Sequence, residues 1–293
     1  MLGRMTFSNS IQNKPVQDMI QGMLNLANSE EEEEPSTKAK VESSSENKVI
    51  PLQIKKCSKE KFQIPTGFVR SSLFGVVGRG KRTAMERKEI ASWKGWTIKY
   101  TGFQLDQMDE DILMALANMA QDTPDGIIRT SKRNLLRVCG KKGSGGRNME
   151  IVKDSIIRMA ACIIEVKYQQ KWYSGHIINW IAGEDKNDDL VICMDMKMKW
   201  LWESSTWVNK EIRRSLGSFQ LAKKMYDYIC SQQATIYSPH QISLSKLMPL
   251  CGCNYKRERD FRKRLNDAMK EIESNSEIQW NIENNILKFW ISK

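Results

Sequence analysis

One order of helical and strand-like segments occurs twice along the chain. Apolar residues recur every three or four positions in the helical segments and at every second position in the strands. The first copy contains a helix from Asp106, a strand over 126–130, helices over 131–140 and 147–162, and alternating strands. The second copy contains a helix capped by Ser218, a strand over 242–244, helices over 245–250 and 256–273, and a hairpin turning at Asn284 and Asn285. This is the order of a winged helix-turn-helix, so we expect an α+β fold with two tandem winged-helix domains.

The first 48 residues differ in composition from the rest. Residues 1–46 carry eight acidic and four basic groups, and the stretch from Ser29 to Lys48 is charged and rich in serine. Such a stretch buries too little apolar surface to offset the entropy lost on ordering it. We therefore expect a disordered acidic N-terminal tail over 1–48, a first winged-helix domain over 49–205 and a second over 206–293.

The remainder of the chain is strongly basic. It holds 42 basic and 27 acidic residues, a net charge of +15. Clustered Lys and Arg favour a polyanionic partner because they displace the counterions of phosphates; a solubilising surface charge is the alternative. No apolar run reaches the roughly 20 residues that span a bilayer, and the N-terminus lacks a signal pattern. We therefore expect a cytoplasmic protein without membrane contact.

The sequence gives little support for an enzymatic or metal site. The segment GVVGRGK (75–81) has the spacing of a P-loop, but Arg82 follows where Ser or Thr should hold magnesium. A rolling-circle nickase needs clustered histidines, whereas the only two histidines stand apart. The cysteines are odd in number, and Cys251 and Cys253 have no second pair to complete a zinc site. We therefore expect reduced thiols, no cofactor, no metal and no catalytic activity.

The segment KRERDFRKRLNDAMKEIE (256–273) carries the clearest indication of DNA binding. At 100° per residue, Phe261, Leu265, Ala268 and Ile272 form one apolar stripe that should face a core. Arg, Lys and Asn on the other side are the side chains that pair with guanine and adenine edges in the major groove. The predicted contacts are Lys256, Arg257, Arg259, Arg262, Lys263, Asn266 and Lys270. An ordinary solvated face is the alternative, although so many like charges repel one another without a partner.

Two basic, glycine-bearing segments in the first domain extend the predicted DNA surface. KKGSGGR (141–147) leads into the third helix, and GRGKR (78–82) lies upstream. Glycine lets backbone N–H groups approach a phosphate at a helix N-terminus; flexible loops without a ligand are the alternative. The predicted contacts are Lys141, Lys142, Arg147, Asn148, Lys153, Arg158, Arg79, Lys81 and Arg82. Trp172, like other tryptophans in the alternating strands, is expected in a core or on a sheet face.

The order of motifs adds a family resemblance. The relevant segments are FVRSSLFGVVGRGKR (68–82), IKYTGFQLDQMDEDIL (98–113), KKMYDYICSQ (223–232) and ISLSKLMPLCG (242–252). Together they resemble the replication domain of the TrfA family of plasmid replication initiators, over residues 65–293. The resemblance implies binding to repeated origin sequences, called iterons, as a monomer, opening of the AT-rich duplex and recruitment of host DnaA and DnaB helicase. It also implies an inactive homodimer and a role in plasmid copy control.

Other functions and partners stay open. A winged-helix transcriptional repressor would bind an operator without opening DNA or loading a helicase. A single-strand or RNA-binding module would need exposed stacking aromatics. Contact with the host sliding clamp is also open, because QISL (241–244) resembles the start of a clamp-binding motif but continues with Ser245 and lies in an expected strand.

Overall fold

The computed structural model describes residues 58, 60–78, 80–121, 123, 125–141, 143, 145–184 and 188–292. The predicted tail over 1–48 lies outside these residues, as do two predicted DNA contacts, Arg79 and Lys142. Residues 51–293 belong to one compact unit.

The first copy of the repeated order begins at a capped helix. It comprises α3 (Gln107–Ala120), β6 (Ile127–Ser131), α4 (Lys132–Val138), α5 (Gly146–Ala161), β9 (Ile178–Gly183) and β10 (Asp189–Met194). The cap predicted at Asp106 is confirmed, since its side chain accepts from the backbone N–H groups of Met108 and Asp109. The three strands form one antiparallel sheet in the order β6-β10-β9.

The second copy has the same sheet order. It comprises α8 (Gln220–Gln232), β12 (His240–Ser243), α9 (Leu244–Leu250), α10 (Glu258–Asn275), β13 (Ile278–Glu283) and β14 (Ile286–Ile291). The strands lie in the order β12-β14-β13, so in both copies the last strand of the hairpin is central. The predicted Ser218 cap is wrong: α8 starts after Phe219, which makes no side-chain capping bond. Asn284 and Asn285 have positive φ and form the predicted hairpin turn.

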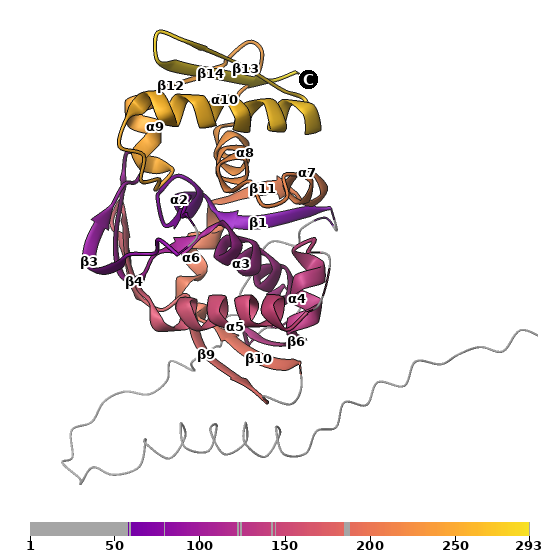
Figure 1. The fold of residues 1–293 in the computed structure, drawn as a ribbon. Coiled ribbons are helices and arrows are strands. Elements are labelled where there is room, and N and C mark those ends of the chain that lie inside the picture. Colours follow the sequence, from indigo (N-terminus) through magenta and orange to yellow (C-terminus); the bar gives the residue numbers. More distant parts are fainter. Residues whose placement is uncertain are drawn as a thin grey trace, which may run out of the picture. The chain divides into compact units, whose positions relative to one another are not determined.

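Further strands surround and join the two copies (Figure 1). A four-stranded antiparallel sheet has the order β3-β4-β7-β8, from β3 (Ala84–Ile90), β4 (Trp96–Phe103), β7 (Ile163–Tyr168) and β8 (Lys171–Gly175). β2 (Phe74–Gly75) pairs parallel with β5 (Leu105–Asp106). β1 (Lys61–Pro65) pairs with β11 (Ser205–Asn209), so a strand crosses the domain boundary predicted at 205. The mixed helix and strand content agrees with the predicted α+β class.

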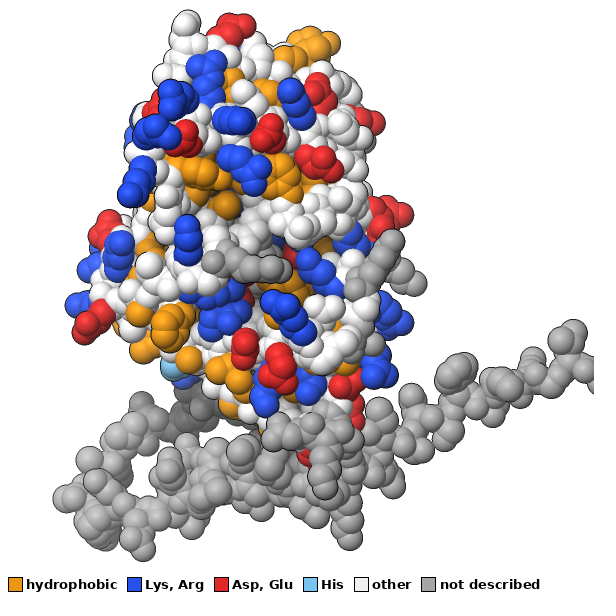
Figure 2. All heavy atoms as spheres, in the orientation of Figure 1, with side chains coloured by type: hydrophobic (Ala, Val, Ile, Leu, Met, Phe, Trp, Pro, Cys, Tyr) orange, Lys and Arg blue, Asp and Glu red, His pale blue; other side chains and the backbone are white. Residues whose placement is uncertain are grey.

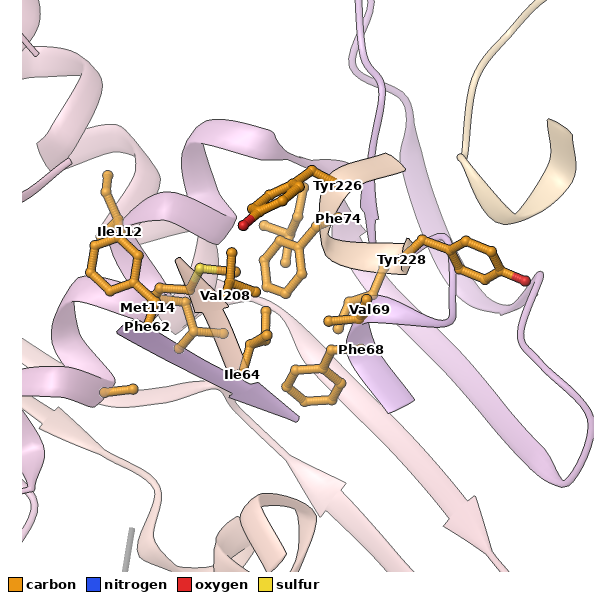
Figure 3. Packing of buried hydrophobic residues seen from close by; sticks show 14 of the residues in the cluster. Phe62, Ile64, Phe68, Val69, Phe74, Ile112, Met114, Val208, Tyr226 and Tyr228 are labelled. Carbon is orange, nitrogen blue, oxygen red and sulfur yellow. The ribbon is translucent and has the colours of Figure 1, made fainter. Parts of the chain in front are cut away.

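Short helices complete the fold and carry part of the core. They are α2 (Thr66–Val69), the 3-10 helix η1 (Met196–Met198), α6 (Lys199–Glu203) and α7 (Lys210–Ser215). Figure 3 shows Phe62 and Val208 of the paired strands packing near Phe74, Ile112 and Tyr226. Because Ile112 belongs to α3 and Tyr226 to α8, one continuous apolar core joins the two copies.

A buried ionic cluster also joins the copies. Arg213 of α7 is 1% exposed, and its Nε donates to Asp111 Oδ1 of α3 at 2.8 Å. Its Nη1 pairs with Asp227 of α8, and Lys223 Nζ of α8 donates to Asp111 Oδ2 at 2.6 Å. Glu110 Oε2 lies 3.6 Å from Arg213 Nη2. We call these five residues the junction cluster.

Burial and charge act in opposite directions on the junction cluster. Burial alone would raise the pKa of Asp111, but the attraction of Arg213 and Lys223 outweighs it and holds that pKa below its usual value. Desolvation lowers the pKa of Lys223 despite the neighbouring Asp111. Each of these charged side chains is therefore tolerated in the interior because an oppositely charged side chain pairs with it. None of the described helices is long and apolar enough to cross a membrane.

Candidate nucleic-acid interface

Helix α10 presents a basic face to solvent. Its buried side carries the predicted stripe of Phe261, Leu265, Ala268 and Ile272, which is confirmed and extended by Met269. The predicted contacts lie on the opposite side of the helix or just before it. Lys256, Arg257, Arg259, Lys263 and Lys270 are exposed, and Arg262 and Asn266 are half-buried.

Most of these cations are available to a ligand. In the part of the chain that the structure describes, Arg259, Lys263 and Lys270 form no ion pair. Arg257 Nε pairs with Asp260 Oδ2 at 2.8 Å across one turn. Arg262 Nη1 donates to Asn285 Oδ1 at 3.1 Å, which ties α10 to the tip of the β13–β14 hairpin. The hairpin tip therefore lies beside the basic face.

The equivalent helix of the first copy, α5, has a different outward face. Arg147 is exposed as predicted, but Glu150 and Asp154 share the face with it. Ile151 and Ile157 are also exposed, at 39% and 44%. The sequence prediction named Arg147, Asn148, Lys153 and Arg158 in this helix, and did not include the acids and isoleucines that share its outward face.

Two predicted DNA contacts, Arg82 and Arg158, form ion pairs with buried acids of the first copy. Arg158 Nη2 lies 2.8 Å from Asp109 Oδ1, and Arg82 Nη1 lies 3.1 Å from Asp109 Oδ2. Arg82 Nη2 also lies 2.5 Å from Asp106 Oδ2, and Ser155 Oγ donates to Asp109 Oδ1 at 2.5 Å. Burial, followed by the charge of Asp109, raises the pKa of Asp106 although Arg82 opposes the shift. These arginines neutralise buried acids and hold α5 against the start of α3.

The other predicted residues of the first copy lie around α5 and upstream of it. Asn148 is half-buried, and its Nδ2 donates to the carbonyl of Gly143 at 3.0 Å. Lys141 and Lys153 are half-buried, whereas Lys81 is exposed. Among the described cations of the GRGKR segment, Lys81 is thus accessible, whereas Arg82 is paired with acids.

Helices α5 and α10 lie on the same side of the molecule and run across the view in Figure 1. Figure 2 shows the same view in space-filling form: many Lys and Arg side chains lie over the upper part, where α10 lies, and acidic side chains lie among them there as well as near α5. The two helices therefore differ in which residues share their outward faces, and not in whether acids are present.

No set of three or more His, Cys, Asp or Glu side chains among the described residues could hold a metal ion. Their six cysteines are free thiols. Burial raises the pKa of Cys162 and that of Cys253 to about 11, so both thiols stay protonated at neutral pH.

Comparison with known proteins identifies the fold. No protein-family model matches the sequence, and no curated protein is significantly similar to it in sequence. The structure is similar to a crystal structure of domains 2 and 3 of RctB, with a TM-score of 0.53 and 14% identity, over 78% of this chain and 99% of that one. A second structure of RctB domains 2–3 gives a TM-score of 0.49 and 14% identity, over 73% and 93% of the two chains. The first of these similarities shows a shared fold.

Proposed function

We propose that this protein is a plasmid replication initiator that binds repeated duplex DNA, and that each copy of the repeated order is a winged-helix domain. The observation that carries the proposal is the solvent-facing side of α10, where Arg259, Lys263 and Lys270 have no ion-pair partner among the described residues. The shared sheet order supports the domain type. The fold similarity to RctB, a replication initiator, supports the class of function.

The chemistry of α10 suits the major groove of B-form DNA, which is wide enough to admit a helix. Arg and Lys donate to the O6 and N7 acceptors of guanine, and Asn pairs with adenine through N6 and N7. Arg259, Lys263 and Asn266 would read these edges, while Lys256 and Arg257, just before the helix or at its start, would contact phosphates. The bond from Arg262 to Asn285 would hold the β13–β14 hairpin near the neighbouring backbone.

The further steps of initiation are proposed from the resemblance to the TrfA family. The protein would bind iterons as a monomer, help to open the AT-rich duplex and recruit DnaA and DnaB helicase in the bacterial cytoplasm. A homodimer would be the inactive form. The protein would act without catalysis of its own, by binding energy alone.

DNA selection followed by titration tests the proposal. Duplexes enriched from a random pool give the preferred site, and affinity is then measured for that site and for a scrambled duplex at near-physiological salt. Arg259→Ala with Lys263→Ala should weaken binding to the selected site by about 2–6 kcal/mol, because each good base contact is worth about 1–3. Lys88→Ala with Lys167→Ala removes the same charge from the four-stranded sheet and is the matched control. Unchanged affinity of a folded α10 variant would refute the assignment of the reading helix.

A replication assay separates initiation from simple operator binding. A plasmid that carries the cognate origin should be maintained in cells only when the wild-type protein is supplied, and should be lost with the α10 double variant. Specific binding without plasmid maintenance would instead identify a transcriptional repressor. Equal affinity for selected and scrambled duplexes would leave only nonspecific binding.

A further inference from the structure

A groove lies between the segment upstream of the first copy and the second copy, beside α10. It encloses a cavity of about 520 Å³. One wall comes from the segment that contains Val76, Val77 and Lys81, upstream of the first copy. The other walls come from residues 218–221 at the start of α8 and from residues 253–255 and Arg264 of the second copy. We call this the junction groove.

Two cations from different parts of the chain face the junction groove. Lys81 is exposed and forms no ion pair with any described residue. Arg264 lies over the ring of Phe219, with its guanidinium carbon 5.3 Å from the ring centroid. Its Nη1 is 3.8 Å from Asp267 Oδ2, a loose contact between two largely exposed side chains.

The rest of the lining suits an anion with polar oxygens. The described lining includes no acidic side chain, and it offers the amides of Gln220 and Asn254 and the hydroxyl of Ser218. Gln220 Oε1 accepts from the backbone N–H of Val77 at 2.8 Å, which fixes the two walls to each other. Val76, Leu221 and Tyr255 add apolar lining, so the cavity suits a ligand that joins phosphate oxygens to apolar carbon, as the sugar–phosphate backbone does, and disfavours a cation.

The position of the junction groove identifies the source of that phosphate. Residues 253–255 immediately precede Lys256 and Arg257, so the groove adjoins the N-terminal end of α10. A helix that reads the major groove with its N-terminal half has a phosphate backbone along each of its flanks. The backbone on the α8 side of α10 would pass over Arg264 and Lys81.

We infer that the junction groove binds the sugar–phosphate backbone of the duplex that α10 reads, with Lys81 and Arg264 contacting phosphates from opposite walls. This inference rests on the proposed function and adds Arg264, which the sequence did not single out, to the DNA surface. One wall lies upstream of the first copy and the others lie in the second copy, so backbone binding depends on how the upstream segment packs on the second copy. The contacts carry no base information and contribute to affinity for every duplex.

Salt-dependent titration tests the inference. Each cation that neutralises a phosphate contributes about 0.9 to the slope of log affinity against log salt concentration for B-form DNA. Lys81→Ala and Arg264→Ala should each lower that slope by about 0.9, and the double variant by about twice as much. Affinity for selected and scrambled duplexes should fall by the same factor, so their ratio stays at the wild-type value.

Matched variants make the outcome unambiguous. Arg264→Lys keeps the charge and should retain the wild-type slope, and Lys167→Ala, on the four-stranded sheet, should leave it unchanged. If both groove variants kept the wild-type slope while the Arg259→Ala with Lys263→Ala variant lost specific binding, the groove inference would be wrong and the proposed function would stand. If the wild-type protein showed no preference for any duplex, the proposed function would fail first.

Discussion

Replacing Arg213 with methionine should destabilise the protein far more than replacing an exposed arginine. The guanidinium is 1% exposed and contacts Asp111 and Asp227, with Glu110 nearby. Methionine fills a similar volume but donates no hydrogen bond. Asp111 would keep Lys223, whereas Asp227, which is fully buried, would lose the ion pair that the structure gives it. The substitution therefore leaves an uncompensated charge in the interior.

The expected magnitude follows from that unpaired carboxylate. Removing one partner of a buried ion pair costs about 3–5 kcal/mol, mostly because the remaining charge stays desolvated. With a urea dependence of about 3 kcal/mol per molar, the unfolding midpoint should fall by about 1–2 M. Arg257→Met breaks an exposed pair with Asp260 and should cost only about 0–1 kcal/mol.

The loss should also depend on pH. The pKa of Asp111 in the folded protein is depressed, so its pairing stabilises the fold above the unfolded pKa, about 3.9, and that contribution disappears as pH falls through the folded pKa. Without Arg213, burial is less opposed and the pKa of Asp111 rises. The difference in unfolding free energy between wild type and variant should therefore be largest near pH 7 and shrink as the pH falls through the raised pKa of Asp111 in the variant.

Urea unfolding followed by circular dichroism at pH 7, 5.5 and 4.5 measures both effects. A loss below about 1 kcal/mol at pH 7 would contradict the reasoning, because an exposed ion pair costs that much. A loss of unfolding free energy of the expected size that did not change with pH would show that lost packing is responsible, and not the charge of the buried carboxylates. Arg213→Lys should give an intermediate loss, since an ammonium cannot reproduce the forked contacts of the guanidinium.

Two further predictions concern α5 and the junction. Glu150→Ala with Asp154→Ala should tighten binding to any duplex by roughly 0.5–1 kcal/mol per carboxylate if α5 approaches phosphates, because like charges are removed; unchanged affinity in a titration would place α5 away from DNA. Gly252→Ala should lower the unfolding free energy by about 1–2 kcal/mol, since its φ is +61° and the new Cβ would lie 2.9 Å from the Cα of Gly75. Gly146→Ala, where nothing lies within 4 Å, is the control and should not destabilise in urea unfolding.

Local patterns in the sequence predict the elements of this fold well where apolar spacing decides them. The stripe from Phe261 to Ile272 indicates which side of α10 is buried because a helix with that spacing has only one apolar side. The cap at Asp106 follows from its own side chain and its position before an apolar run. Trp172 lies on a sheet as expected but is 74% exposed, because alternation along edge strand β8 does not reveal whether anything covers its face.

The partners of charged residues are not visible in the same patterns. Arg82 and Arg158 resemble free cations in the sequence, yet both pair with Asp109, which lies 27 and 49 positions away. The contact between Arg213 and Asp111 spans 102 positions. A local window gives the charge of each residue and not its burial, so cations that bind a ligand and cations that neutralise a buried acid look alike until the fold brings them together.

The two copies of the repeated order differ in whether their cations pair with buried acids or remain without an ion pair. Arg82, upstream of the first copy, and Arg158, within it, neutralise the acids at the start of α3, and α5 faces outward with acids and isoleucines. In the second copy Arg259, Lys263 and Lys270 of α10 form no ion pair with any described residue. If the proposed function holds, we therefore expect α10 to read the bases and the upstream segment to contact the backbone through Lys81. Such a division depends on how the upstream segment is held on the second copy, and the hydrogen bond from the backbone N–H of Val77 to Gln220 Oε1 joins these two walls of the junction groove.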